Sequence, residues 1–138
     1  MTPMGLDQPG EQRYVGPDPS SLFGVAHATR RIEVADGGQL AIILCNFALP
    51  PDRFNNSVAD ILILLPAGYP DSPPDMFHAL PWISLVSPNR YPRAADQPVV
   101  FAGQKWQRWS RHNNAWRPGI DGIWTMLKRI QTALEEAA

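Results

Sequence analysis

The most informative stretch of this 138-residue sequence is LLPAGYPDSPPDMF, residues 64–77, which has four prolines within nine positions. Proline restricts φ to about −65° and has no backbone N–H, so the stretch can form neither a helix nor a central strand. A tyrosine placed between prolines can pack its ring against them while its hydroxyl finds a backbone partner. The stretch therefore predicts a rigid, extended corner of the chain.

Three strands are predicted before this corner. Residues 31–35 and the apolar, β-branched run at 40–47 flank a turn at Asp36-Gly37-Gly38, which predicts a hairpin. A third strand is predicted over residues 58–65, where the sequence VADILILL follows a polar loop and ends at Pro66. Because consecutive strands are joined by short loops, we expect antiparallel pairing.

Irregular chain is predicted after the corner, followed by one helix. Further prolines at 81, 88, 92 and 98 remove backbone donors, so long regular elements are excluded before Gly119, and only residues 76–78 and 83–86 could still be strands. From residue 120 onward, apolar side chains recur at spacings of three and four, which predicts an amphipathic C-terminal helix. The apolar positions are Ile120, Ile123, Trp124, Leu127, Ile130 and Leu134. Trp124 is expected to be interior, and Asp121 is expected to be a helix N-terminal charge.

The chain length fits one globular domain, expected over residues 21–138. Residues 1–20 have almost no apolar periodicity and are expected to be a flexible tail. A short helix is predicted between Ser20 and Arg31. The sequence has neither the layout of a secretory signal nor an apolar run of about 18 residues. We therefore expect a cytoplasmic protein with no membrane partner.

Cysteine content and charge exclude several classes of protein. A single cysteine, Cys45, cannot form an internal disulfide, and no Cys/His spacing fits a zinc site. The formal net charge of −1 gives no overall attraction to nucleic acid or to an anionic membrane. Residues 90–117, however, contain six basic residues and a single acid, Asp96. This segment would form a positive surface wherever it is exposed.

The corner resembles the ubiquitin-conjugating enzyme (UBC) family, in which a third strand runs into Pro, two residues, Tyr-Pro, two residues and Pro-Pro, followed shortly by an apolar residue. The matching residues are Pro66, Tyr69, Pro70, Pro73, Pro74 and Phe77. Trp116-Arg117-Pro118 looks like the family's Trp-x-Pro element, and Ser87-Pro88-Asn89 is a looser match to its His-Pro-Asn. The string from Trp106 to Asp121 is similar to a prokaryotic branch of the superfamily.

The resemblance covers roughly residues 31–135 and implies an α+β fold of the UBC type. In that fold an antiparallel four-stranded meander packs on a C-terminal helix, with a proline-rich crossover on one side. The prokaryotic branch is found beside ubiquitin-like proteins, activating enzymes and metal-dependent isopeptidases, which the resemblance therefore implies as partners.

The family's catalytic cysteine has no counterpart here. In ordinary members this cysteine lies between the His-Pro-Asn and Trp-x-Pro elements, and counting back eight residues from Trp116 leads to Arg108. A thiolate is needed because it exchanges with the activating enzyme's thioester and leaves well when an amine attacks. Cys45 lies in the apolar run of a predicted strand, so we interpret it as a buried, inert thiol; a relocated nucleophile is the alternative.

The candidate site residues lie between Trp106 and Trp116. His112 is in a polar stretch, residues 110–114, where it could act as an acid or base, orient the C-terminus of a ubiquitin-like protein, or be a structural loop histidine. The candidate binding residues are Trp106, Trp109, Ser110, Arg111 and Trp116. Tryptophans interleaved with cations can pack the core, bind a protein or stack nucleic-acid bases, and packing is the favoured interpretation.

No spaced carboxylate pair, phosphate loop, dinucleotide fingerprint or Gly-x-Ser-x-Gly motif is present, so we expect neither a cofactor nor a metal. Three functions remain as hypotheses. The first is a UBC-like component that binds or positions a ubiquitin-like modifier in a bacterial conjugation pathway. The second is an active conjugating enzyme that uses His112 or Cys45. The third and weakest is a nucleic-acid binder that uses the basic tryptophan segment.

Overall fold

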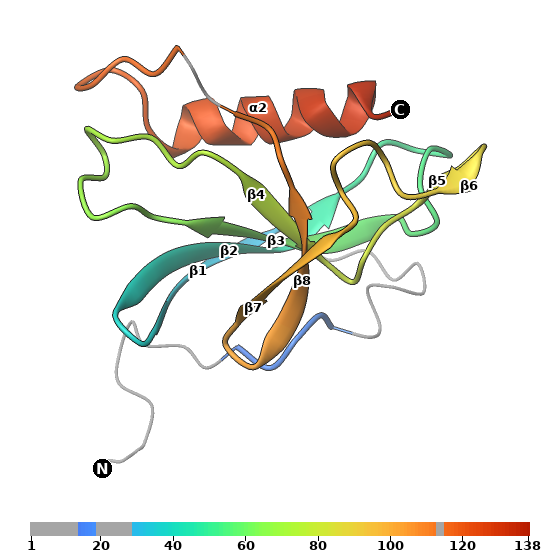
Figure 1. Cartoon of the computed structure of the whole chain (residues 1–138), viewed down its shortest axis with the longest axis horizontal. Coiled ribbons are helices and arrows are strands. Elements are labelled where there is room, and N and C mark those ends of the chain that lie inside the picture. Colours follow the sequence, from blue (N-terminus) through green and yellow to red (C-terminus); the bar gives the residue numbers. More distant parts are fainter. Residues whose placement is uncertain (1–13, 19–28, 113–114) are drawn as a thin grey trace.

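A six-stranded antiparallel sheet with a helix on one face forms most of this computed structural model, which describes residues 14–18, 29–112 and 115–138 (Figure 1). The strand order is β1-β2-β3-β4-β8-β7. The bounds are β1 (Arg30–Asp36), β2 (Gln39–Ala48), β3 (Val58–Leu64), β4 (Phe77–Leu80), β7 (Gln97–Phe101) and β8 (Gln104–Trp109). Two short strands, β5 (Leu85–Val86) and β6 (Asn89–Arg90), form a separate ribbon, and helix α2 spans Ile123–Glu136.

Strands β1 to β3 confirm the three strands predicted before the corner. The β1–β2 turn pairs Asp36 with Gln39, and the two intervening glycines both have positive φ. Strand β2 is buried continuously from Ala41 to Cys45 because both faces of the sheet are covered. Its alternate side chains enter different cores, since Ile42 faces α2 and Ile43 faces the opposite cluster with Trp106.

The sheet has six strands, and the prediction of no long element between the corner and Gly119 is wrong. Strand β8 pairs with β4, and β7 pairs with β8. The prolines did not prevent this because Pro98 lies on β7, the outer strand of the sheet, where a missing N–H removes no central ladder bond. Of the predicted strand at residues 83–86, only β5 forms, and it lies outside the main sheet.

The C-terminal helix is confirmed, but it begins at Ile123 and Trp124 is not interior. Met126, Ile130 and Leu134 are the buried residues of α2. Trp124 has 76% of its surface exposed. At about 100° per residue, Trp124 is about 160° around the helix from Met126. The spacing of three and four therefore included a residue that faces solvent.

The start of α2 is stabilised by Asp121, two residues before the helix. Its carboxylate accepts hydrogen bonds from the backbone N–H of Arg117 (2.8 Å), from Nη2 of Arg117 (3.0 Å) and from the hydroxyl of Thr125 (3.0 Å). The hydrogen bonds from Arg117 lower the pKa of Asp121 to about 2. A carboxylate at this position interacts favourably with the partial positive charge at the N-terminus of the helix.

The proline-rich corner contacts the segment that precedes α2. Within the corner, the N–H of Tyr69 donates to the carbonyl of Pro66 (3.0 Å). The indole N–H of Trp116 donates to the carbonyl of Pro70 (2.9 Å). Phe77, at the end of the corner, is buried and stacks on Trp109 with ring centroids 5.2 Å apart. The corner and the Trp116 segment therefore support each other, although they are far apart in sequence.

Most of the expected tail and the predicted short helix lie outside the described residues. The helix would fall on residues 19–28, and Arg30 already begins β1. Within the expected tail, Tyr14 is buried, stacks on Trp106 at 5.3 Å and donates its hydroxyl to Asp60 at 2.8 Å. Among the described residues, no helix is both long enough and apolar enough to cross a bilayer.

Candidate functional site

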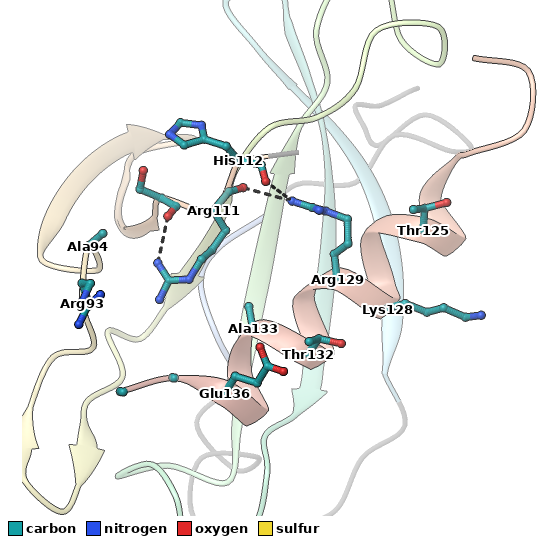
Figure 2. A pocket seen from close by; sticks show the side chains of 13 residues that line it. Arg93, Ala94, Arg111, His112, Thr125, Lys128, Arg129, Thr132, Ala133 and Glu136 are labelled. Atoms are coloured by element: carbon teal, nitrogen blue, oxygen red, sulfur yellow. Dashed lines mark hydrogen bonds between the residues drawn. The ribbon is translucent and has the colours of Figure 1, made fainter. Parts of the chain in front are cut away.

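A cavity of about 740 Å³ lies between α2 and two chain segments, residues 93–94 and 110–112 (Figure 2). We call it the α2 groove. Four cations line it, Arg93, Arg111, Lys128 and Arg129, together with the carboxylate of Glu136 and the C-terminal residue Ala138. An oxygen of Ala138 accepts a hydrogen bond from the backbone N–H of Arg93 (2.9 Å). His112 and Ser110, both predicted as site residues, also line it. The basic segment recognised in the sequence thus contributes one wall of a positively charged groove.

The wall at residues 110–112 is positioned by the end of β8. Trp109, the last residue of β8, is fully buried between Phe77 and Phe54. Immediately after it, the N–H of Ser110 donates to the carbonyl of Ala94 (3.0 Å), which joins the two chain segments of the groove. The location of the polar residues is therefore set by the packing of an aromatic core.

Gln107 holds the neighbouring loops in place from inside the core. Its side chain is completely buried and forms four hydrogen bonds. The amide oxygen accepts from the N–H of Ile83 (2.9 Å) and from the indole of Trp109 (3.2 Å). The amide nitrogen donates to the carbonyls of Ile83 (2.9 Å) and Ala95 (2.8 Å). The contact to Ala95 fixes the chain beside Ala94, so a residue that the sequence did not single out supports the groove.

Arg129 joins α2 to the opposite wall. Its Nη2 donates to the carbonyl of His112 (2.8 Å) and, more distantly, to that of Arg111 (3.4 Å), as Figure 2 shows. These carbonyls follow the end of β8 and need a donor. Arg129 was not among the predicted site residues, because helical periodicity does not say which segment the polar side of a helix faces.

The guanidinium of Arg111 lies over the ring of Trp109. Its guanidinium carbon is 5.0 Å from the centroid of the Trp109 ring, and Nη1 donates to the carbonyl of Ser110 (3.0 Å). Stacking of this kind is a cation–π contact. Burial lowers the pKa of Arg111, and repulsion from Arg93 lowers it further. The positive charge is therefore partly removed from water and placed close to a second cation.

His112 pairs with an acid from the proline-rich corner. Its Nδ1 lies 2.8 Å from Oδ2 of Asp75, and both side chains are about half exposed. A carboxylate on Nδ1 orients the imidazole and leaves Nε2 as the nitrogen that can exchange a proton with a substrate. Asp75 and His112 are 37 positions apart in the sequence, and only the fold brings the corner beside residue 112.

The tryptophans predicted as binding residues are mainly structural. Trp106 and Trp109 have no exposed surface, so neither ring can contact a partner. They fill opposite sides of the sheet, because an odd separation on a strand places two side chains on opposite faces. Trp116 is partly buried and uses its indole N–H within the protein. Of the five predicted binding residues, Ser110 and Arg111 line the α2 groove.

The single thiol is remote from this chemistry. Cys45 is buried in β2 with 6% of its surface exposed. Burial raises the pKa of its thiol, and the negative charge of Asp60 raises it further. Arg108, the position reached by counting back from Trp116, is a partly buried residue of β8. Among the described residues, no group of three His, Cys, Asp or Glu side chains is placed to hold a metal ion.

Comparison with curated proteins and with solved structures finds no match to this chain. Comparison with protein families shows that the model for prokaryotic E2 family E matches residues 26–137. The matched region includes all of the sheet, the proline-rich corner, all of α2 and every residue that lines the α2 groove except Ala138. The E2 proteins are the UBC-like proteins of ubiquitin-type conjugation, in agreement with the resemblance at residues 64–77. The chain belongs to prokaryotic E2 family E, a UBC-like family.

Proposed function

We propose that this chain binds and positions a ubiquitin-like modifier in a bacterial conjugation pathway, with the α2 groove as the contact surface. Family membership indicates a role in ubiquitin-like conjugation and, in general, interaction with a ubiquitin-like protein and an activating enzyme. A metal-dependent isopeptidase of the same pathway is a further proposed partner, and the cytoplasm is the proposed location.

One observation favours a binding role over a transferase role. The only thiol is buried, whereas the groove beside residues 110–112 is open and charged. Thioester exchange needs an accessible thiolate, and both burial and a raised pKa keep Cys45 in the unreactive thiol form. Binding in the groove needs no thiol. The α2 groove can therefore hold part of a modifier without the covalent step.

The test uses the purified chain with the activating enzyme, ATP and the ubiquitin-like protein of the same organism. We expect saturable binding of the modifier by calorimetry and no thiol-sensitive adduct on gels run with and without reductant. The matched binding variants are Lys128→Gln in the groove, which should weaken binding, and Arg31→Gln on β1, which should not. A reductant-sensitive adduct that disappears in Cys45→Ala would contradict the binding role.

A second candidate function, amide-forming transfer assisted by His112, is supported by the 2.8 Å pairing of its ring with Asp75. An imidazole oriented by a carboxylate can accept the proton of a lysine amine as the amine adds to the adenylated C-terminal carbonyl of the modifier. Breaking the carbonyl–phosphate bond then releases AMP and leaves the amide. If this is correct, the amount of modifier–lysine amide formed in the mixture above falls in His112→Ala while modifier affinity is unchanged. Equal product in both proteins would remove this candidate.

A further inference from the structure

The α2 groove has an excess of positive charge that its own carboxylates do not balance. Four cations line it against two carboxylates, the side chain of Glu136 and the terminal carboxylate of Ala138. Glu136 follows Arg129 by seven residues, which is about 10 Å along a helix. Lys128 adds a point charge, and Arg129 adds charge while its Nη2 is used by backbone carbonyls. The arginines left to bind an anion directly are Arg111 and Arg93.

Arg111 is already oriented for such a contact. Its guanidinium is held on the Trp109 ring, and its one hydrogen bond among the described residues uses Nη1. A guanidinium has five N–H donors, so several remain for the two oxygens of an anion. Figure 2 shows Arg111 extending toward the loop that carries Arg93. An anion bound between them would relieve the repulsion that lowers the pKa of Arg111.

The surroundings favour a peptide carboxylate over a nucleic-acid phosphate. Nucleic-acid grooves combine cations with exposed aromatic rings, whereas Trp106 and Trp109 are buried here. The whole chain carries a net charge of −1, which gives no long-range attraction to a polyanion. Small side chains, Ala94 and Ala133, line the groove and allow a narrow, extended chain to lie close to α2.

We propose that Arg111 and Arg93 bind the free C-terminal carboxylate of a ubiquitin-like modifier whose extended tail lies in the α2 groove. This inference rests on the proposed function, and it adds the chemical group that is recognised. An arginine pair that requires a free carboxylate distinguishes an unlinked modifier from one whose terminus is already in an amide bond, because an amide has no negative charge. The chain would thereby select the unconjugated form.

The test compares two fluorescent hexapeptides that end in two glycines, one with a free C-terminal carboxylate and one with a C-terminal amide. Fluorescence anisotropy with the full chain should show the acid binding at least about tenfold more tightly than the amide, as expected for loss of a charge-assisted pair. Arg111→Gln and Arg93→Gln should each reduce this ratio toward one. Arg31→Gln, which removes an exposed arginine on β1, should leave it unchanged.

Equal affinity for the acid and the amide would overturn the inference, as would a preference that persists in the Arg111→Gln, Arg93→Gln double variant. Displacement of the acid peptide by an equal concentration of single-stranded oligonucleotide would also overturn it, in favour of a phosphate site. Arg93 is exposed, so Arg93→Gln remains a valid test if Arg111→Gln fails to fold.

The intact modifier separates this inference from the proposed function. The modifier is prepared with its natural terminus and with a C-terminal amide. If both forms bind equally, the proposed function stands and the carboxylate inference fails. If the acid peptide shows its Arg111-dependent preference while the intact modifier does not bind, the carboxylate site stands and the proposed function fails.

Discussion

His78 shows how strongly position in the sheet changes the chemistry of a single residue. It lies in β4 with 3% of its surface exposed, and its Nδ1 donates to the carbonyl of Leu62 (3.2 Å). Burial lowers its pKa to about 4, and the nearby positive charge of Arg108 acts in the same direction. The buried imidazole is therefore neutral at pH 7, as a core histidine without a carboxylate partner should be.

We predict that His78 makes the protein less stable as the pH falls from about 6.5 to about 4. In this window the unfolded chain binds a proton at residue 78 and the folded chain does not, so acid favours unfolding. The full effect is about 3 kcal/mol, from the difference between the ordinary pKa and the lowered one. Urea unfolding at several pH values measures it.

His78→Gln should remove the part of the pH dependence of stability that corresponds to uptake of one proton on unfolding, whereas Arg31→Gln, at an exposed site on β1, should retain it. Retention of the full slope in His78→Gln would show that another group is responsible.

At the scale of elements, the two sides of α2 have different roles. Met126, Ile130 and Leu134 face the sheet, whereas Trp124 faces solvent. Residues facing the groove, such as Arg129, lie beside the apolar stripe. The sequence pattern predicted the helix correctly. It could not tell which apolar residues are buried, because a spacing of three or four also admits a residue such as Trp124 that lies outside the buried stripe.

We expect Trp124→Ala and Met126→Ala to differ sharply in stability. Trp124→Ala should change the free energy of unfolding by less than about 0.5 kcal/mol, because an exposed side chain loses little on truncation. Met126→Ala should cost about 2–5 kcal/mol, because it leaves a cavity under the helix. Chemical denaturation of both variants measures the difference, and similar losses would contradict the orientation of α2.

Strand β8 explains why sequence patterns predicted fewer strands than the sheet contains. Its residues alternate between the two cores, with Trp106 on one face and Trp109 on the other, yet lysine, arginine and glutamine interrupt them. Gln107 is buried despite being polar because four hydrogen bonds satisfy its amide. A pattern search that requires polar residues to face water cannot identify such a strand.

At the scale of the whole molecule, four of the twelve basic residues line one groove while the chain as a whole is nearly neutral. This distribution suits a small charged group on a protein partner better than a long polyanion, because nucleic-acid affinity grows with the number of phosphates neutralised. The buried tryptophans also remove the stacking surface that the sequence had suggested.

We therefore predict no saturable binding of a fluorescent single-stranded DNA in anisotropy measurements at about 150 mM salt. Any binding at about 50 mM salt should disappear as salt is added, because only the release of counterions from the DNA would drive it. The modifier, bound through shape and a local charge contact, should lose far less affinity over the same range. Tight DNA binding at the higher salt concentration would contradict the assignment of the groove to a protein partner.

The sequence by itself determined the resemblance to the UBC-like family, three strands and the C-terminal helix, because these depend on local rules: motif spacing, alternation and helical periodicity. It also showed that the family's thiol position has no cysteine. Only the tertiary structure decided that Trp106 and Trp109 are core, that Asp75 meets His112, and that Arg93, Arg111, Lys128 and Arg129 surround one groove. Those contacts join residues far apart in the chain, and their formation depends on how β8 and α2 pack on the sheet rather than on any spacing within a segment.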